Sequence, residues 1–318
     1  MKRRAILAVP LAAPAFAQEA WPTRPIRLVV AFPPGGGSDL MARAVAPRLG
    51  EALGQSIIVE NRSGAGGTVG THSVALARPD GYTLLFANGG EFALKPLVEP
   101  RLPYDAQRDF TPVVLLGVTP VVLAVHPSVP ARSFAEFVAL ARARPGAISV
   151  SNSGSGGVMH LTAAYIAHRA GIDVAHIPYR GAAPAVADAV AGTVQAVVSG
   201  LPPVLAQARQ ERLRILAVAV PRRMPAIPDV PTLSELGLSG FDMSNTVGLV
   251  APAGTPPTVL EAINRAANGA IAEAEVRRVF QANGADPRGS TAAEYVAFLA
   301  AERARFAEAL RATGIRME

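Results

Sequence analysis

Short runs of β-branched and other apolar residues alternate along most of the chain with longer segments that have helical periodicity. This alternation is typical of parallel sheets flanked by helices, so it predicts an α/β fold. Ten strands would be more than one small sheet needs, and 318 residues suffice for two domains. The predicted strands span residues 26–32, 56–60, 82–86, 113–117, 121–125, 148–151, 174–177, 196–199, 214–220 and 247–251.

Two extended segments, 121–125 and 248–252, lie where one strand-helix series ends and another begins. We therefore predict a discontinuous first lobe, residues 22–123 and 248–318, wrapped around a second lobe, residues 124–247. Each lobe is expected to be a mostly parallel sheet flanked by helices. Ligands of open α/β sheets bind beyond the carboxyl ends of the strands, which places the predicted site between the lobes.

Residues 32–39 read Phe-Pro-Pro-Gly-Gly-Gly-Ser-Asp, directly after an apolar run and before a helical pattern. A strand that breaks at three glycines, and restarts as a helix with a Ser38-Asp39 cap, leaves backbone N–H groups free at the positive end of the helix dipole. The segment therefore predicts a site for an anion.

Several kinds of site are disfavoured by missing motifs. After Lys2 the only lysine is Lys95, and no glycine precedes it, so the chain has no phosphate-binding Gly-Lys-Ser/Thr motif. Segment 64–70 approaches the dinucleotide fingerprint, but Val69 replaces the third glycine. No Gly-x-Ser-x-Gly motif occurs, the five histidines lack metal-ligand spacing, and basic residues do not cluster with aromatic ones. We expect no catalytic residues, metal, cofactor or nucleic-acid partner.

Glycine- and hydroxyl-rich loops recur at the ends of predicted strands in both lobes. Such loops can line one site if the strand ends meet. With no catalytic set in the sequence, they indicate a protein that binds a small molecule between two hinged lobes. The candidate ligand-binding residues are Pro34, Gly36, Gly37, Ser38, Asn88, Gly89, Gly90, Glu91, Ser153, Gly154, Ser155, Gly156, Gly157, Tyr179, Arg180, Gly181, Ser199 and Gly200.

Three pairs of a Ser or Thr with a Glu three residues later predict capped helix starts, at Ser133, Thr232 and Thr291. We interpret all three as local caps without a role in binding.

The N-terminus has the order of a secretory signal: basic residues 2–4, an apolar stretch, and the small-residue sequence Ala15-Phe16-Ala17. We predict a signal peptide over residues 1–17, with cleavage near Ala17 and export by either the general or the twin-arginine route. With no cysteine in the chain, disulfides and a lipidated cysteine are excluded, and we expect a periplasmic protein without a lipid anchor.

Seven segments together resemble the substrate-binding proteins of tripartite tricarboxylate transporters, also called Bug receptors. They are residues 21–26 (WPTRPI), 32–39 (FPPGGGSD), 59–67 (VENRSGAGG), 79–85 (PDGYTLL), 176–181 (HIPYRG), 225–232 (PAIPDVPT) and 248–256 (GLVAPAGTP). The resemblance implies a two-lobed periplasmic receptor that closes on a small carboxylate and delivers it to the membrane components of such a transporter. We expect the receptor to be a monomer. In the family, the loops matching residues 36–38 and 88–91 hold a carboxylate from the first lobe. Those matching 153–157, 179–181 and 199–200 close from the second.

The chain departs from the family pattern within these loops. Residues 88–91 replace a loop often rich in threonine and serine, residues 157–159 lack further hydroxyls, and Ser199-Gly200 stand where an acid-amide pair is common. Fewer hydroxyl donors favour a ligand less polar than citrate, such as an aromatic or short aliphatic monocarboxylate. We expect Glu91 to point to solvent, the alternative being contact with an amino group of the ligand.

Two other functions remain open at this point. The chain could be a secreted serine hydrolase that uses an unrecognised nucleophile such as Ser155. It could also be a ligand sensor whose closed form acts on a membrane kinase.

Overall fold

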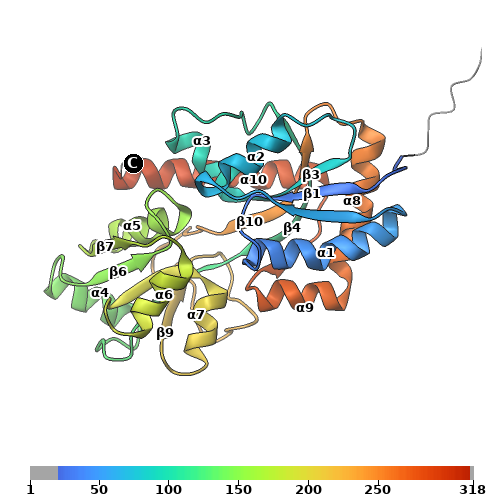
Figure 1. Cartoon of the computed structure of the whole chain (residues 1–318). Coiled ribbons are helices and arrows are strands. Elements are labelled where there is room, and N and C mark those ends of the chain that lie inside the picture. Colours follow the sequence, from blue (N-terminus) through green and yellow to red (C-terminus); the bar gives the residue numbers. More distant parts are fainter. Residues whose placement is uncertain (1–20, 316–318) are drawn as a thin grey trace, which may run out of the picture.

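The computed structural model describes residues 21–315, which form two sheets, each flanked by helices (Figure 1). The strand order is β11-β4-β10-β3-β1-β2 in the first sheet and β7-β6-β8-β5-β9 in the second. We call each sheet, with the helices that pack on it, a lobe. The predicted α/β fold of two helix-flanked sheets is confirmed.

The first lobe is built from both ends of the described chain. Its strands are β1 (Ile26–Val30), β2 (Ile57–Asn61), β3 (Thr83–Asn88), β4 (Phe110–Thr119), β10 (Asn245–Pro252) and β11 (Asp286–Pro287). Its helices are α1 (Gly37–Leu53), η1 (Ala65–Gly67), α2 (Thr68–Ala75), the π-helical turn η2 (Gly90–Leu94), α3 (Lys95–Val98), α8 (Pro257–Ala272), α9 (Ala274–Ala282) and α10 (Ala292–Thr313).

The second lobe comes from the middle of the chain. Its strands are β5 (Val121–Val125), β6 (Ser149–Asn152), β7 (Ala175–Pro178), β8 (Ala196–Gly200) and β9 (Arg214–Val218). Its helices are α4 (Phe134–Ala143), α5 (Val158–Ala170), α6 (Ala182–Val190) and α7 (Leu201–Ala208).

Most strands of each sheet run in the same direction, as predicted, but each sheet also has an antiparallel strand within it, so both sheets are mixed. Strand β1 is parallel to β2 and β3, and β6 is parallel to β7 and β8, but β10 and β5 run antiparallel to their neighbours. The strands β5 and β10 enter their sheets directly from the other lobe rather than through a crossover helix. They therefore start at the edge where the parallel strands end, and run in the opposite direction.

The chain changes sheets a few residues away from the predicted boundaries. Thr119 still pairs with Asn245 in the first sheet, whereas Val121 pairs with Gly200 in the second. The predicted boundary at 123/124 falls inside β5 and that at 247/248 inside β10. Pro120 marks the crossing, because its ring removes the backbone donor that a continuing ladder would use.

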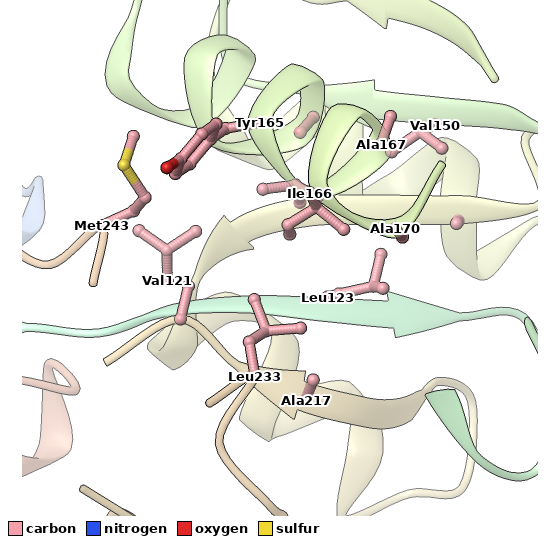
Figure 2. Packing of buried hydrophobic residues seen from close by; sticks show 14 of the residues in the cluster. Val121, Leu123, Val150, Tyr165, Ile166, Ala167, Ala170, Ala217, Leu233 and Met243 are labelled. Carbon is pink, nitrogen blue, oxygen red and sulfur yellow. The ribbon is translucent and has the colours of Figure 1, made fainter. Parts of the chain in front are cut away.

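Apolar side chains fill both faces of each sheet. In the second lobe, Figure 2 shows Ile166 and Ala170 of α5 facing Val121 and Leu123 of β5, and all four are buried. Figure 1 shows α10 running from the first lobe toward α5 of the second. Its residue Tyr295 packs in the first-lobe core, whereas Phe306 joins the core beneath α5. One long helix thus joins the two lobes, in addition to the strand connections.

None of the helices within residues 21–315 is long and apolar enough to cross a membrane. The predicted signal peptide, residues 1–17, lies outside the described residues.

Candidate functional site

The carboxyl ends of the parallel strands in both lobes meet near the crossing at Pro120. Asn88, the last residue of β3, pairs with Val247, two residues after the start of β10. Gly200, the last residue of β8, pairs with Val121, directly after the crossing. A Cβ added at Gly90 would lie 3.8 Å from a methyl carbon of Val158, so the loop after β3 also faces the start of α5. The predicted site loops of the two lobes therefore come together at one junction.

Five helices at these strand ends begin at a glycine. Each of these N-cap glycines has no side chain to accept from the first turn, and none of the five starts has a side-chain cap among the described residues. In α1, α5 and α6 the first-turn N–H groups stay available at the positive end of the helix dipole, which suits an anion. In α2, by contrast, Thr68 and Val69 donate to the preceding turn. In α7 the Leu201 N–H donates to Pro120 O, and the next two residues are prolines without an N–H. The five helices and their N-caps are α1 with Gly36, α2 with Gly67, α5 with Gly157, α6 with Gly181 and α7 with Gly200.

The carboxylate of Asp39 holds the first glycine loop, residues 35–37, in place through hydrogen bonds. It accepts from the Gly35 N–H at 2.9 Å, from Arg43 Nε at 2.9 Å and from Asn61 Nδ2 at 2.9 Å. Burial alone would raise the pKa of Asp39, but these hydrogen bonds outweigh it and lower that pKa. The predicted Ser38-Asp39 cap is thus wrong: Gly36 is the N-cap, and Asp39 lies inside the first turn and holds the loop.

Ser38 links two of the predicted loops. Its hydroxyl donates to Asn88 Oδ1 at 3.1 Å, which joins the start of α1 to the end of β3. Because Oδ1 is engaged, the side chain of Asn88 offers its Nδ2 donors, and this buried atom has no partner in the described part of the chain. A buried amide without a partner costs free energy, so this donor suits a ligand atom.

Glu91 is buried, which overturns the expectation that it points to solvent. Only 2% of the residue is exposed, and its carboxylate accepts the Asn88 N–H at 2.9 Å. A Cβ added at Gly67 would lie 2.6 Å from Glu91 Oε1, so the glycine makes room for the carboxylate. Burial raises the pKa of Glu91 to about 7, although the hydrogen bond from Asn88 works against that rise.

The second lobe presents a similar strand end at Asn152. Its Oδ1 accepts the Gly154 N–H at 3.1 Å, and its buried Nδ2 has no partner among residues 21–315. The backbone O of Asn152 also accepts the Tyr179 N–H at 2.9 Å, which ties the loop after β6 to the loop after β7. The Gly156 N–H donates to His160 Nδ1 at 3.3 Å. Ser199 Oγ, at the end of β8, is buried and equally unpartnered within the described chain.

The remaining predicted site residues differ in what they offer. Tyr179 donates its hydroxyl to Asp188 Oδ2 at 2.5 Å, so that group is engaged within the second lobe. Pro34, Ser155 and Arg180 are exposed. Across the described residues, neither a histidine nor a carboxylate hydrogen-bonds to Ser155, in contrast to the nucleophile of a serine hydrolase.

Sequence reasoning missed three polar groups near the strand ends. Asn152 Nδ2, Asn245 Oδ1 and Thr68 Oγ1 are buried without a hydrogen-bond partner within residues 21–315. Asn245 starts β10 beside the crossing, and Thr68 opens α2 after Gly67. An amide at the end of a predicted strand was a usable signal for Asn152. The other two depend on which neighbours the fold supplies.

Other parts of the described surface lack these features. No three His, Asp or Glu side chains among residues 21–315 are grouped to hold a metal ion. Hollows of about 730, 680 and 420 Å³ lie on the outer surface of the lobes, and none is lined by a predicted site residue or by a residue with a buried unpartnered side-chain atom. The junction is therefore the better candidate for a polar ligand.

Comparison with known proteins gives consistent matches over nearly the whole chain. The sequence profile of the tripartite tricarboxylate transporter family receptors matches residues 41–315. The chain is 37% identical to Protein BugT of Bordetella pertussis, over 97% of this chain and 94% of that protein. It is 40% identical to a UPF0065 protein of Pseudomonas sp. strain P51, over 81% of this chain and 77% of the relative.

Solved structures match equally well. A structure described as a periplasmic transporter has a TM-score of 0.84 at 37% identity, covering 94% of this chain and all of that one. An R. palustris protein solved with adipate has a TM-score of 0.84 at 32% identity, with 93% and 99% coverage. MatC from Rhodopseudomonas palustris, with bound malate, has a TM-score of 0.79 at 31% identity, with 91% and 100% coverage.

Proposed function

The chain belongs to the tripartite tricarboxylate transporter receptor family, and on that premise we propose that it binds a small carboxylate at the junction of its two lobes. The family predicted from the sequence motifs is confirmed, and with it the class of solute-binding receptor for a tripartite transporter. The hydrolase alternative is wrong, because the family and its solved relatives are solute-binding proteins rather than enzymes.

The open starts of α1, α5 and α6 are the observation that carries the proposal. Free first-turn N–H groups, together with the side-chain donors of Asn88 and Asn152, provide charge-assisted hydrogen bonds without an arginine clamp or a metal. Each such bond contributes about 1.5–3 kcal/mol. Three or four would account for micromolar affinity, about −8 kcal/mol, after the cost of ordering the ligand.

The arrangement of donors favours a ligand with acceptor groups at both ends. Asn88 Nδ2 belongs to the first lobe and Asn152 Nδ2 to the second, and each is buried without a partner in the described chain. Adipate and malate, the ligands of two solved relatives, each have two carboxylates. We therefore extend the proposal to a small dicarboxylate, in preference to the monocarboxylate expected from the sequence.

A ligand screen tests this function. Native mass spectrometry of freshly purified protein would give the mass of any carried-over ligand. A thermal-shift series with benzoate, butyrate, malate, adipate and citrate should then give the largest stabilisation with malate or adipate. The largest shift with citrate would contradict the ligand class, and no shift with any carboxylate would contradict the function.

A matched pair of variants connects the screen to the junction. Asn88→Asp keeps the acceptor for Ser38 but replaces the free donor with a negative charge, so the thermal shift should be lost. Gln210→Glu adds the same charge on the exposed surface, and the shift should remain. Equal behaviour of the two variants would contradict binding at the junction.

We further propose that the protein is exported, cleaved near Ala17, and acts in the periplasm as a monomer that delivers its ligand to the membrane components of a tripartite tricarboxylate transporter. The intact mass of exported protein should match a chain starting at Gln18, and light scattering should give the mass of one chain. A retained Met1 or a dimer mass would contradict these points. If the protein is instead a ligand sensor, deleting its gene should change the expression of other genes while the cells still take up the ligand.

A further inference from the structure

Two glutamates lie buried beneath the turn that ends β3. Glu91 is 2% exposed and Glu302, on α10, is fully buried. Both touch the backbone of the turn: Glu91 accepts the Asn88 N–H, and a Cβ added at Gly89 would collide with both carboxylate oxygens of Glu302. The carboxylates therefore lie behind the same residues that present Asn88 to the junction.

Among residues 21–315, Glu302 has hydrogen-bond donors but no salt-bridge partner of its own. It accepts from the Thr246 N–H at 3.1 Å and from the Thr246 hydroxyl at 2.8 Å. The nearby guanidinium of Arg305 is already paired with Asp242, at 3.3 Å. Asp242 adds a further negative charge near Glu302.

The surroundings of Glu91 follow the same pattern. The ammonium of Lys95 lies near enough to act on Glu91, but it is paired with Glu99 and donates to the Ala65 carbonyl. Tyr104 donates its hydroxyl to the backbone O of Glu91 at 2.9 Å, and not to the carboxylate. Each buried acid thus has a cation nearby that another carboxylate already neutralises.

Tyr295 connects the two acids. It is fully buried on α10, and its hydroxyl has no partner among residues 21–315. Burial, followed by the charges of Glu302 and Glu91, raises the pKa of the Tyr295 phenol. Both carboxylates therefore act on one phenol, which makes Glu91, Tyr295 and Glu302 a single cluster behind the turn.

The protonation of this cluster responds to charge near neutral pH. Burial raises the pKa of Glu91 to about 7 and that of Glu302 to about 7, against the lowering effects of their hydrogen bonds and nearby cations. A negative ligand on the opposite side of the turn makes ionisation of either acid still less favourable, and so raises their pKa values further.

We propose that Glu91 and Glu302 are positioning residues that couple carboxylate binding at the junction to the uptake of a proton from solvent. The inference rests on the proposed function, because it requires an anion at that site. Binding places a negative charge in front of the Asn88–Gly90 turn, and a proton joins one of the two carboxylates behind it. By linkage, the affinity for a carboxylate rises as pH falls through the range in which the free acids ionise.

Calorimetry with adipate and malate as probes tests the coupling. Titrations at pH 7.5, in two buffers of different ionisation enthalpy, should show uptake of roughly 0.3 to 1 proton per bound ligand. The affinity should fall roughly three- to tenfold between pH 7 and pH 8.5, a window above the range in which the probe carboxylates titrate. Burial lowers the pKa values of His160 and His176, so these histidines stay neutral there.

Variants identify the groups that take up the proton. Glu91→Gln and Glu302→Gln should each reduce the uptake, and the double variant should bind with a flat pH profile. Glu275→Gln, an exposed glutamate on α9, should behave as the wild type. Wild-type protein that binds a probe with no proton uptake overturns the inference alone, as does full uptake in a folded double variant. If no carboxylate binds at any pH, the proposed function fails, and the inference fails with it. The wild-type measurement decides the coupling even where a variant does not fold.

Discussion

Two helices that begin at the junction, α1 and α5, and two that begin away from it, α4 and α10, close their first turns in different ways. The helices α4 and α10 begin at Ser133 and Thr291, whose side chains accept from the N–H groups of Glu136 and Glu294. The helices α1 and α5 begin at Gly36 and Gly157, without a side-chain cap in the described chain. A Ser or Thr cap stabilises a helix by about 1 kcal/mol relative to alanine. The helices α1 and α5 therefore lack the stabilisation of a side-chain cap, and their first-turn N–H groups remain available for a ligand.

The largest effect should come from closing one of the open starts. Gly157 has extended backbone, at φ −90° and ψ 170°, and a Cβ there would have Gly154 O as its nearest contact, at 3.7 Å. Gly157→Asp should therefore cap α5 and raise the melting temperature, while its charge lowers carboxylate affinity by roughly a hundredfold or more. Gly157→Asn, which caps without a charge, should lose less affinity. Calorimetry that finds unchanged carboxylate affinity in Gly157→Asp would contradict a role for the open start of α5 in binding.

The buried acid behind the open turn should make stability depend on pH. The pKa of Glu91 is raised from 4.5 to about 7 in the folded protein, so its favourable contribution is complete below pH 4.5 and is lost as pH rises through 7. Relative to Glu91→Gln, the wild type should lose about 2–4 kcal/mol of unfolding free energy between pH 4.5 and pH 8. Urea unfolding of both proteins at the two pH values measures this. If the unfolding free energies of the wild type and Glu91→Gln change equally with pH, Glu91 ionises as easily in the folded protein as in the unfolded chain.

The capped starts should respond in the opposite sense to the open ones. Thr291→Ala removes the hydroxyl that accepts the Glu294 N–H at the start of α10, while the backbone N–H of residue 291 can still donate to the Glu294 carboxylate. We expect a loss of about 1 kcal/mol in unfolding free energy, with carboxylate affinity unchanged. Ser133→Ala on α4 serves as a second case of the same kind. A loss of affinity larger than twofold in either variant would show that the capped helices also contribute to the site.

The smallest effect should come from the contact that joins the two first-lobe loops. Ser38→Ala removes the hydroxyl that holds Asn88 Oδ1, and lets the Asn88 amide turn away from the junction. Because one neutral hydrogen bond contributes about 0.5–1.5 kcal/mol, affinity should fall roughly three- to tenfold with little change in stability. Ser234→Ala, in the second lobe away from the strand ends, is the matched control. Equal affinities for the two variants would mean that Ser38 does not orient Asn88.

The strands were predictable because β-branched runs carry their own signal. All ten predicted strands occur within a few residues of their expected positions, and the additional β11 has only the two residues Asp286 and Pro287, too few for a pattern. Strand direction in β5 and β10 was not predictable, because it depends on the edge at which the chain enters each sheet. Thr232 and Glu235 form both capping-box hydrogen bonds, yet no helix follows, so even a strong local signal can be overruled.

The candidate site was likewise predictable from the sequence only in part. Glycines that follow a strand and precede a helical pattern indicate open helix starts, and the structure has them at Gly36, Gly157 and Gly181. The burial of Glu91 was not predictable, because a lone charged residue in a loop is usually exposed. Here the backbone of Asn88 and the space beside Gly67 come from the fold.

Amide chemical shifts test the role of the open helix starts most directly. With adipate or malate added to isotopically labelled protein, the backbone amides at the starts of α1 and α5, from Gly36 to Ser38 and from Gly157 to Met159, should shift together and saturate at one ligand per chain. The amides at the capped starts of α4 and α10 should not move. Saturable binding that leaves the amide signals of the glycine starts unshifted would contradict the account. So would binding that instead shifts the amide signals of the residues lining the hollow between α1 and β2.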